Sequence, residues 1–420
     1  MGGLMPDDIG ALSRLFTWFV DSPLMVVVLF AVAIATATLL LRRLPPIRRV
    51  LAAVESGRHT SIDGLRGFLG IGVFIHHTVI TWFYLHGHGW TLPPSRLVVH
   101  LGQTSVALFF MITAFLFWSR VLSRGSGLNW AEFFISRLCR LYPAYLVMLA
   151  LLVAVAWGFA SQQQQANGNF WPSLASWLVF TMFGTLNLNG LPDTGEAVAW
   201  VTWSLPYEWL FYLVLPALAF VAGRARKPVA AAASAAAVIA LFLSFYWFGV
   251  LDPFNPKILL SFLGGIAAAH WVRNQALKDI GNRRSAGYVA IAALLTVVLF
   301  MPTAYAWKST LGLTVFFVVI ASGHDLWGLL RRPGLLWLGD ISYSIYLLHG
   351  ALLWTVFRHV LPHTLASSAP VYIGVSLVNA IVLVLVASIV FLAVERPAIL
   401  AGKRWQQRLG RSAVPVGASP

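Results

Sequence analysis

The chain has 420 residues, of which 59% are hydrophobic and only 10% are charged, and its mean hydropathy is +0.78. Soluble domains carry about 25% charged residues, so this composition excludes an ordinary soluble protein and predicts an all-α polytopic membrane protein. The formal net charge of +15 arises from basic clusters between apolar runs, which indicates orientation in a membrane rather than binding to nucleic acid. The single cysteine, Cys139, excludes an intrachain disulfide, and we expect no metal site.

Apolar runs of membrane-crossing length recur along the chain. A transmembrane helix needs about 20 predominantly apolar residues. On that criterion we expect eleven crossing helices, at roughly residues 22–41, 65–85, 99–119, 141–160, 203–222, 228–249, 257–273, 287–303, 309–324, 336–358 and 371–394. The run at 22–41 follows acidic rather than basic residues, so we interpret it as a retained helix and not as a signal peptide.

A further apolar stretch, residues 170–188, has an ambiguous topology that the basic residues help to resolve. If it does not cross, every basic cluster falls on one side of the membrane, and if it crosses, the later clusters change sides. Because basic loops remain in the cytoplasm, we expect an interfacial or re-entrant segment here. The N-terminus then lies outside and the C-terminus lies in the cytoplasm.

The helix expected around residues 61–82 carries an arginine near its start and two histidines in its middle. His77 lies ~16 Å along this helix from Arg66, which places Arg66 near the cytoplasmic headgroups and His77 near the midplane. A neutral histidine at that depth can act as a general base toward a hydroxyl. The alternative is a packing histidine. His76 points about 100° away from His77, and we expect it to bond a neighbouring helix.

Arg137 and Arg140 lie three residues apart, on one face of the helix that contains AEFFISRLCRLYPAY. Arginine pairs at a membrane face suit phosphate groups, which they bind through bidentate hydrogen bonds. The alternative is that both residues only anchor the helix on the cytoplasmic side.

Two polar segments flank the spans. The longest outer segment, about residues 161–202, holds Asp193 and Glu196, and it is either a lid or acceptor-binding region or a solvated connector. The last segment, residues 401–420, is basic and then rich in small residues, so we expect a disordered cytoplasmic tail.

Glu208 is the one acidic residue well inside a span in the first two thirds of the chain, within WSLPYEWLFYLVLP from Trp203. It lies ~8 Å below the outer end of its helix, and His77 lies ~12 Å below the outer end of its own, so the two depths are similar. An imidazole–carboxylate pair would orient the histidine and stabilise its protonated form. The alternative is a carboxylate hydrated at the outer interface.

A late helix contains LGDISYSIYLLH, in which polar residues recur at helical spacing. Ser342, Tyr346 and His349 share one face, and Tyr343 lies beside them. This helix runs outward, so His349 also lies near the midplane. A polar stripe inside an apolar helix usually faces a cavity, whereas the alternative is hydrogen bonding between helices.

Together these stretches resemble membrane acyltransferase family 3, the O-acyltransferases that modify surface polysaccharides and related glycans. The motifs that carry the resemblance are Asp63, Gly64, Leu65, Arg66, Gly67 and His77; Arg137, Arg140, Tyr142 and Pro143; Trp203, Ser204, Leu205, Glu208, Phe211 and Tyr212; Ser342, Tyr343, Tyr346, Leu347 and His349; and Glu395 and Pro397. The similar region covers about residues 60–400, and the helix at 22–41 precedes the usual ten-helix core. We therefore expect an N-terminal part (1–59), an acyltransferase membrane domain (60–400) and a tail (401–420).

The resemblance implies a multi-pass protein of the bacterial inner membrane that takes an acyl group, in the first instance acetyl, from cytoplasmic acyl-CoA. The acceptor would be a hydroxyl of a cell-surface, periplasmic or lipid-linked glycan. Catalysis is assigned to His77 and Glu208, donor binding to Asp63, Arg66, Arg137 and Arg140, and the cavity lining to Trp203, Ser204, Ser342, Tyr343, Tyr346 and His349. The alternative is a transporter of a glycan, lipid or acylated metabolite, because buried ionisable groups suit transport too.

Overall fold

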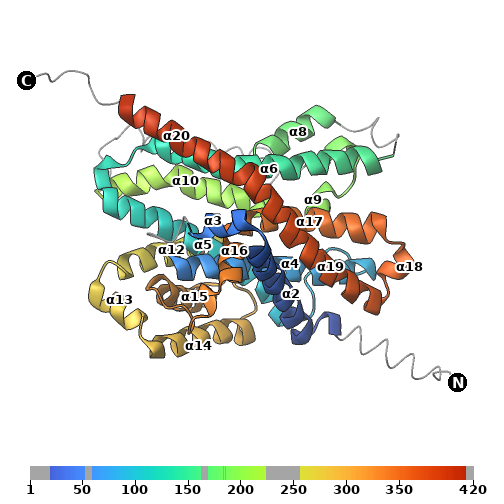
Figure 1. Cartoon of the computed structure of the whole chain (residues 1–420), viewed down its shortest axis with the longest axis horizontal. Helices are drawn as coiled ribbons and strands as arrows, with labels where there is room; N and C mark the ends of the chain where they lie inside the picture. The colour runs from blue at the N-terminus through green and yellow to red at the C-terminus, as the bar shows by residue number, and fades with distance from the viewer. Residues whose placement is uncertain are drawn as a thin grey trace, which may run out of the picture. The chain divides into compact units, whose positions relative to one another are not determined.

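The computed structural model describes residues 19–52, 59–161, 169–182, 184, 186–223 and 256–412, and every regular element in these ranges is helical (Figure 1). This confirms the predicted all-α class. The chain forms two compact units, of which unit 1 comprises residues 1–119, 193–204 and 254–385, and unit 2 comprises residues 120–192, 205–253 and 386–420. The expected span at 228–249 lies outside the described residues.

Unit 1 contains the N-terminal helices and most of the C-terminal half of the chain. Its α-helices are α2 (Pro23–Arg43), α3 (Pro45–Ala52), α4 (Thr60–Leu85), α5 (Arg96–Arg124, whose last turn belongs to unit 2), α9 (Thr194–Ala197), α12 (Pro256–Trp271), α13 (Gln275–Gly281), α14 (Arg284–Phe300), α15 (Trp307–Ala321), α16 (Pro333–Asp340), α17 (Ser342–Thr355), α18 (His363–Ala366) and α19 (Ala369–Val390, which ends in unit 2). The short 3₁₀ turns η3 (Val201–Trp203) and η4 (Leu329–Arg331) and the π turn η5 (Val356–Val360) complete it.

The described part of unit 2 contains fewer helices. They are α6 (Trp130–Phe159), α8 (Phe170–Leu178), α10 (Ser204–Val221) and α20 (Arg396–Ser412), with the 3₁₀ turns η1 (Gly125–Gly127) and η2 (Leu188–Gly190) and the π turn η6 (Phe391–Glu395). Asn129 begins α6 because its side-chain oxygen accepts hydrogen bonds from the N–H groups of Ala131 and Glu132.

In unit 1, α16 packs against both α4 and α2 (Figure 1). Glycines make the contact with α4 possible, because a Cβ on Gly67 would lie 2.4 Å from the carbonyl oxygen of Leu335, and one on Gly339 would lie 2.0 Å from that of Asp63. No side chain fits at such distances, so the backbones touch directly. This packing brings the DGLRG segment of α4 against the start of α17.

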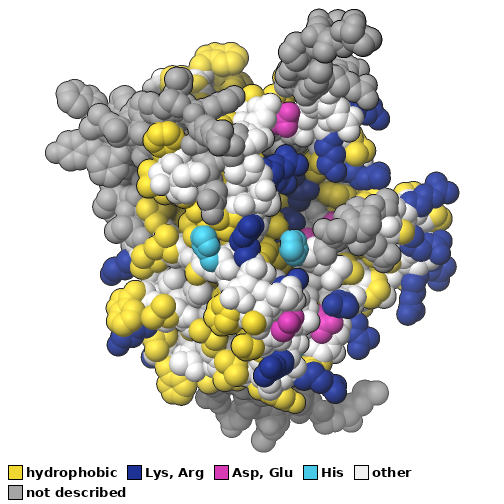
Figure 2. Space-filling view, turned by 90° about the vertical axis from the view of Figure 1, so that its left-hand side faces the viewer, with side chains coloured by type: hydrophobic (Ala, Val, Ile, Leu, Met, Phe, Trp, Pro, Cys, Tyr) yellow, Lys and Arg dark blue, Asp and Glu magenta, His cyan; other side chains and the backbone are white. Residues whose placement is uncertain are grey.

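Many large hydrophobic side chains are exposed, and several polar side chains are buried. Hydrophobic side chains cover much of the face in Figure 2, and large ones such as Val27 (61% exposed) and Ile389 (64% exposed) face outward. By contrast, the side chains of Ser344 and His349 are fully buried. Exposed apolar area on this scale is typical of lipid contact.

Six helical segments of the described residues are long and apolar enough to cross a membrane. They are Pro23–Arg43, Thr60–Leu85, Arg96–Arg124, Trp130–Phe159, Val201–Val221 and Ala369–Gln407. The pair α13 and α14, bent by 71°, makes a seventh if it counts as one span. The eleven expected crossings are therefore not confirmed. Two of the expected spans, α12 and α15, are apolar but shorter, and a third, 336–358, is broken at Ile341 into α16 and α17.

Two further segments can be compared with the sequence expectation. Among the described residues of 170–188 the one α-helix is α8, whose nine residues rise about 14 Å and are too short to cross a bilayer. Residues 401–412, predicted as part of a disordered tail, instead continue α20, so that prediction is wrong for this stretch. The reason is packing on α6, where the side chain of Gln406 donates a hydrogen bond of 2.6 Å to the carbonyl oxygen of Glu132. Residues 413–420 lie outside the described residues.

Candidate active site

Two helices of unit 1, α4 and α17, lie side by side and carry most of the predicted site residues. Near the start of α17, Nη2 of Arg66 donates a hydrogen bond of 3.2 Å to Oγ of Ser342, which in turn donates to the carbonyl oxygen of Gly339 at 2.8 Å. The carboxylate of Asp63 lies 3.8 Å from Nη1 of Arg66. The break in the helix at Ile341 places Ser342 in the first turn of α17, opposite Arg66.

His77, eleven residues after Arg66 in the sequence, meets His349 of α17. Nδ1 of His77 lies 3.0 Å from Nε2 of His349 and 3.1 Å from the carbonyl oxygen of Val73. Nδ1 of His349 lies 3.1 Å from the carbonyl oxygen of Ile345. The two helices are thus joined by polar contacts at two levels, one at Arg66 and one at His77.

The carbonyl contacts determine where the protons lie in the neutral histidine pair. A carbonyl oxygen only accepts hydrogen bonds, so Nδ1 of His349 carries the proton that it donates to Ile345. Nε2 of His349 is then an acceptor, and Nδ1 of His77 donates to it and to the carbonyl oxygen of Val73. Nε2 of His77 keeps a lone pair, which is the form that a general base requires.

Four side chains extend the site from His77, and we call Tyr84, Trp90, Glu196 and Arg358 the outer cluster. Trp90 stacks on His77, with ring centroids 6.1 Å apart and planes at 22°, and meets Tyr84 edge to face at 5.8 Å. Nη1 of Arg358 donates to the hydroxyl of Tyr84 and lies 3.8 Å from Oε2 of Glu196. Burial raises the pKa of Glu196 above its usual value, while the hydrogen bond with Tyr84 and the charge of Arg358 act in the opposite direction.

A strained turn of the outer segment holds Glu196. Asp193, Ala199 and Trp200 all have φ between 54° and 57°, a left-handed conformation that costs about 1–3 kcal/mol for a residue with a side chain. The ring of Trp200 covers Gly195, where a Cβ would lie 2.5 Å from the ring. Strain of this kind persists where the surroundings over-determine the backbone, which is common at functional sites.

The turn before α10 contacts α17 within unit 1. The hydroxyl of Tyr346 donates a hydrogen bond of 2.8 Å to the carbonyl oxygen of Val201 and lies 2.7 Å from Oγ of Ser204. Trp203 packs edge to face against Phe110, with centroids 6.4 Å apart. The polar face of α17 predicted from Ser342, Tyr346 and His349 thus contacts polar groups of other segments along its whole length.

Unit 2 contains a basic cavity of about 370 Å³ between α6, the end of α5 and α20. Its basic lining residues are Arg120, Arg124, Arg137, Arg140 and Lys403. Among the described lining residues Glu132 is the one carboxylate, so the cavity carries a net positive charge and suits a phosphorylated ligand. Arg137 and Arg140 were predicted to lie on one face, and both line this cavity.

Arg140 has an ion-pair partner in the closing Glu-x-Pro motif. Its Nη1 lies 3.0 Å from Oε1 of Glu395, whose side chain is fully buried in η6. A π turn often marks a functional site, and here it turns Glu395 toward α6. The pair fixes the position of Arg140 at the wall of the basic cavity.

Glu208 also lies in unit 2, on α10. The hydroxyl of Tyr212, one turn later, donates a hydrogen bond of 3.2 Å to Oε1 of Glu208. Arg137 is close enough for its charge to act on both side chains. The expected pairing of Glu208 with His77 joins residues of the two units and stays a prediction, whereas within unit 1 the partner of His77 is His349.

The predicted site residues are therefore divided between the two units. Unit 1 holds Asp63, Arg66, His77, Trp203, Ser204, Ser342, Tyr343, Tyr346 and His349, and unit 2 holds Arg137, Arg140 and Glu208. His76 bonds a neighbouring helix as expected, since its Nδ1 lies 2.8 Å from the carbonyl oxygen of Val98 on α5. Tyr84, Trp90 and Arg358 were not predicted, although an aromatic residue directly after the Gly-rich LHGHG loop was a usable signal for Trp90.

Comparisons with known proteins identify one family model and several relatives. The model, described as an acyltransferase domain, matches residues 59–394. Exopolysaccharide production protein ExoZ of Rhizobium meliloti is 26% identical over 311 residues, which are 72% of this chain and 91% of the relative. Nodulation protein 10 of Rhizobium leguminosarum is 24% identical over 333 residues, 72% of this chain and 85% of the relative.

A third relative is a longer protein. Peptidoglycan O-acetyltransferase OatA of Listeria monocytogenes is 24% identical over 322 residues, which are 69% of this chain but 48% of the relative. The similar region is thus about half of that enzyme. No solved structure matches the chain significantly.

Proposed function

The chain belongs to the acyltransferase family whose model matches residues 59–394, and on that premise we propose that it transfers an acetyl group from cytoplasmic acetyl-CoA to a glycan hydroxyl. One observation carries the proposal, namely the His77–His349 contact that leaves a lone pair on Nε2 of His77. The names of two relatives, an exopolysaccharide production protein and a peptidoglycan O-acetyltransferase, support a glycan as the acceptor.

In the proposed reaction, Nε2 of His77 takes the proton of the acceptor hydroxyl while the hydroxyl oxygen attacks the thioester carbonyl. The new C–O ester bond forms, the C–S bond breaks, and the proton passes from the imidazolium to the departing thiolate of CoA. General base catalysis of this type contributes about 10²–10⁴-fold to a rate. His349 orients the imidazole by accepting from its Nδ1–H, and Glu208 is the second residue that we assign to catalysis, as the carboxylate that stabilises the imidazolium.

For the donor, we propose that the phosphates of CoA bind in the basic cavity of unit 2. Its five basic side chains offer the charge-assisted hydrogen bonds that phosphate oxygens require. Arg140, held by Glu395, would provide a fixed donor group, and Arg137 its neighbour on the same helix face. Arg66 with Asp63 forms a second donor-binding group, ~16 Å along α4 from His77.

For the acceptor, we propose the outer cluster as the glycan-binding surface. Trp90 and Tyr84 present aromatic faces next to His77, and the paired charges of Glu196 and Arg358 offer hydrogen bonds to sugar hydroxyls. Amphipathic aromatic side chains with a few polar groups are the usual composition of a small-molecule site. The outer segment around Glu196 would then be an acceptor-binding region rather than a connector.

The proposed location is the bacterial inner membrane, with eleven crossings, the N-terminus outside and the C-terminus in the cytoplasm. The supporting argument is that basic clusters remain in the cytoplasm. In this orientation the basic cavity, which includes Lys403 of α20, opens to the cytoplasm, where acetyl-CoA is available.

Transfer of radiolabelled acetyl from acetyl-CoA, by the purified full-length protein in lipid and with candidate glycans, tests this proposal. Lys403 lines the basic cavity and its neighbour Arg404 does not, so Lys403→Ala and Arg404→Ala form a matched pair. We expect Lys403→Ala to raise the KM for acetyl-CoA about tenfold and Arg404→Ala to leave it unchanged. Equal KM values in the two variants would contradict the donor site. Vesicle transport of a glycan without any acetyl transfer would favour the transporter alternative.

A further inference from the structure

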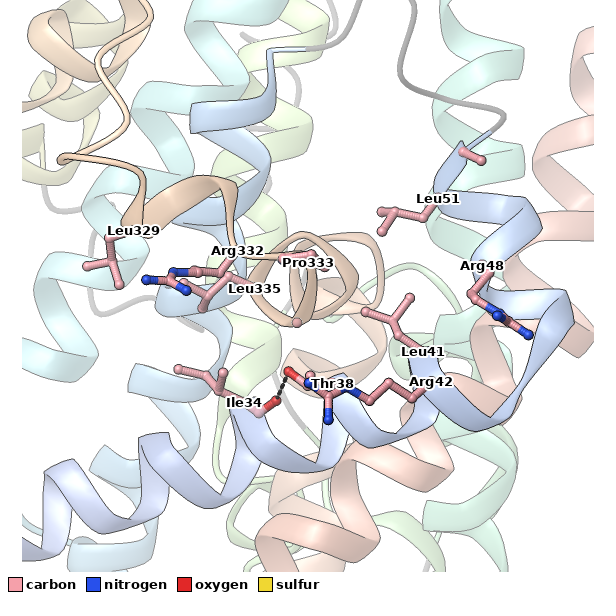
Figure 3. A pocket seen from close by; sticks show the side chains of 12 residues that line it. Ile34, Thr38, Leu41, Arg42, Arg48, Leu51, Leu329, Arg332, Pro333 and Leu335 are labelled. Atoms are coloured by element: carbon pink, nitrogen blue, oxygen red, sulfur yellow. Dashed lines mark hydrogen bonds between the residues drawn. The ribbon is translucent and has the colours of Figure 1, made fainter.

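The N-terminal helices of unit 1 border a cavity of about 850 Å³ that the proposed acyl transfer does not use (Figure 3). The cavity lies between α2 and α3 on one side and the segment from η4 to the start of α16 on the other. Its volume is at the upper end of the range of about 300–1,000 Å³ that is usual for ligand sites. Since α2 and α3 precede the matched domain at 59–394, one side of this cavity is formed by residues outside the acyltransferase region.

One wall of the cavity is apolar and close-packed. Ile34 and Leu41 of α2, Leu51 of α3 and Leu335 of α16 line it. A Cβ on Gly334 would lie 2.4 Å from Oγ1 of Thr38 on α2, so α16 touches α2 directly at one end of the cavity. Helix packing therefore defines the shape of this wall, and an acyl chain fits its chemistry.

Arginines line the remainder of the cavity. The side chain of Arg42 runs along α2 toward Thr38, and that of Arg48 projects from α3 (Figure 3). Arg332 lies on the opposite side of the cavity, after η4. None of these three arginines forms an ion pair with a carboxylate of the described residues, whereas the neighbouring Arg331 is paired with Asp325 at 2.9 Å. The three guanidinium groups lie apart from one another in Figure 3, so together they give the cavity a positively charged edge, and guanidinium groups bind phosphate especially well.

The position of the cavity indicates the source of that anion. The apolar helix α2 ends at Arg43, and α3 follows directly as a short amphipathic helix with Ile47 and Val50 buried and Arg48 exposed. A short basic amphipathic helix next to a membrane span is typical of the headgroup region of a bilayer, where anionic lipids attract arginine. We propose that this cavity binds an anionic phospholipid, with its headgroup among the arginines at the edge of the cavity and an acyl chain on the apolar wall.

Native mass spectrometry of the full-length protein tests the proposal after exchange from phosphatidylcholine nanodiscs with and without phosphatidylglycerol. Two double variants form a matched pair, because each replaces one arginine of α2 and one of α3 and each removes two positive charges. Arg42→Gln/Arg48→Gln removes charges that line the cavity, and Arg43→Gln/Arg49→Gln removes adjacent charges that do not. We expect the first pair to lower the retention of phosphatidylglycerol about tenfold or more, and the second to change it less than about twofold.

Arg332→Gln provides an independent variant, because this residue is exposed and lies on the other side of the cavity. Several-fold weaker retention in this single variant is expected even if a double variant fails to fold. Equal losses in the two double variants would overturn the proposal, since they would indicate only a diffuse surface charge. Displacement of phosphatidylglycerol from the wild-type protein by free CoA would also overturn it, by identifying the donor rather than a lipid as the occupant.

Discussion

Nδ1 of His77 lies 3.0 Å from Nε2 of His349, so within unit 1 a histidine, and not a carboxylate, orients the proposed catalytic base. A neutral imidazole can hold its neighbour in one tautomer as a carboxylate does, but it brings no negative charge to stabilise the imidazolium. The carboxylate that supplies this charge would be Glu208, through the pairing predicted from its depth. The two roles of orientation and charge stabilisation are then carried by different residues.

Replacement of His349 by alanine should slow acetyl transfer without weakening donor binding. Nδ1–H of His77 would lose its acceptor on α17 and keep only the carbonyl oxygen of Val73, so the orientation and the tautomer of the imidazole would be held less firmly. We expect kcat to fall about 100-fold and the KM for acetyl-CoA to stay near the wild-type value. Steady-state kinetics in lipid measure both constants, and a wild-type kcat in a folded His349→Ala variant would remove the positioning role.

Replacement of Glu395 by glutamine should destabilise unit 2. The buried carboxylate pairs with Arg140, and removal of one partner from a buried ion pair costs about 3–5 kcal/mol. The matched comparison is Arg331→Gln, which breaks an ion pair with Asp325 in which the arginine is 60% exposed, and which should cost less than about 1 kcal/mol. Thermal unfolding in detergent compares the two variants, and similar melting temperatures would show that the Arg140–Glu395 pair is not stabilising.

Glu196 should give the reaction a pH dependence on the acceptor side. Burial raises the pKa of Glu196. As the pH falls, the carboxylate that pairs with Arg358 therefore becomes protonated earlier than an exposed glutamate would. We therefore expect kcat/KM for the glycan to decrease on the acidic side through this raised pKa. Glu196→Gln, which has no titrating group, should have a lower kcat/KM for the glycan at neutral pH and should lack this acidic decrease. A pH profile that is identical in wild type and Glu196→Gln would exclude Glu196 from acceptor binding.

Helical periodicity was sufficient to predict the parts of the site that lie within single helices. Arg66 and His77 share α4, and the polar face of Ser342, Tyr346 and His349 on α17 has polar partners at each of its three positions. Such groupings can be predicted because spacing along one helix fixes which side chains lie on a common face. The all-α class followed in the same way from the length and polarity of the apolar runs.

Contacts between helices could not be predicted from spacing. The meeting of His77 with His349 on α17 depends on how closely α4 approaches the preceding helix α16, which glycines such as Gly67 and Gly339 permit. The helix break at Ile341 could not be predicted either, because no proline or glycine at that position signals it. Helix α20 was missed for a related reason, since a basic sequence predicts disorder unless a partner such as α6 covers one of its faces.

The rate of labelled acetyl transfer by His77→Asn tests the role of His77 most directly. Asparagine keeps an N–H donor near the position of Nδ1, so that the contacts with Val73 and His349 can persist, and it removes Nε2 altogether. For the full-length protein in lipid, with acetyl-CoA and an accepted glycan, we expect the rate to fall about 10²–10⁴-fold. The KM for acetyl-CoA should change less than about twofold. Transfer by His77→Asn at the wild-type rate would contradict the assignment of His77 as the general base.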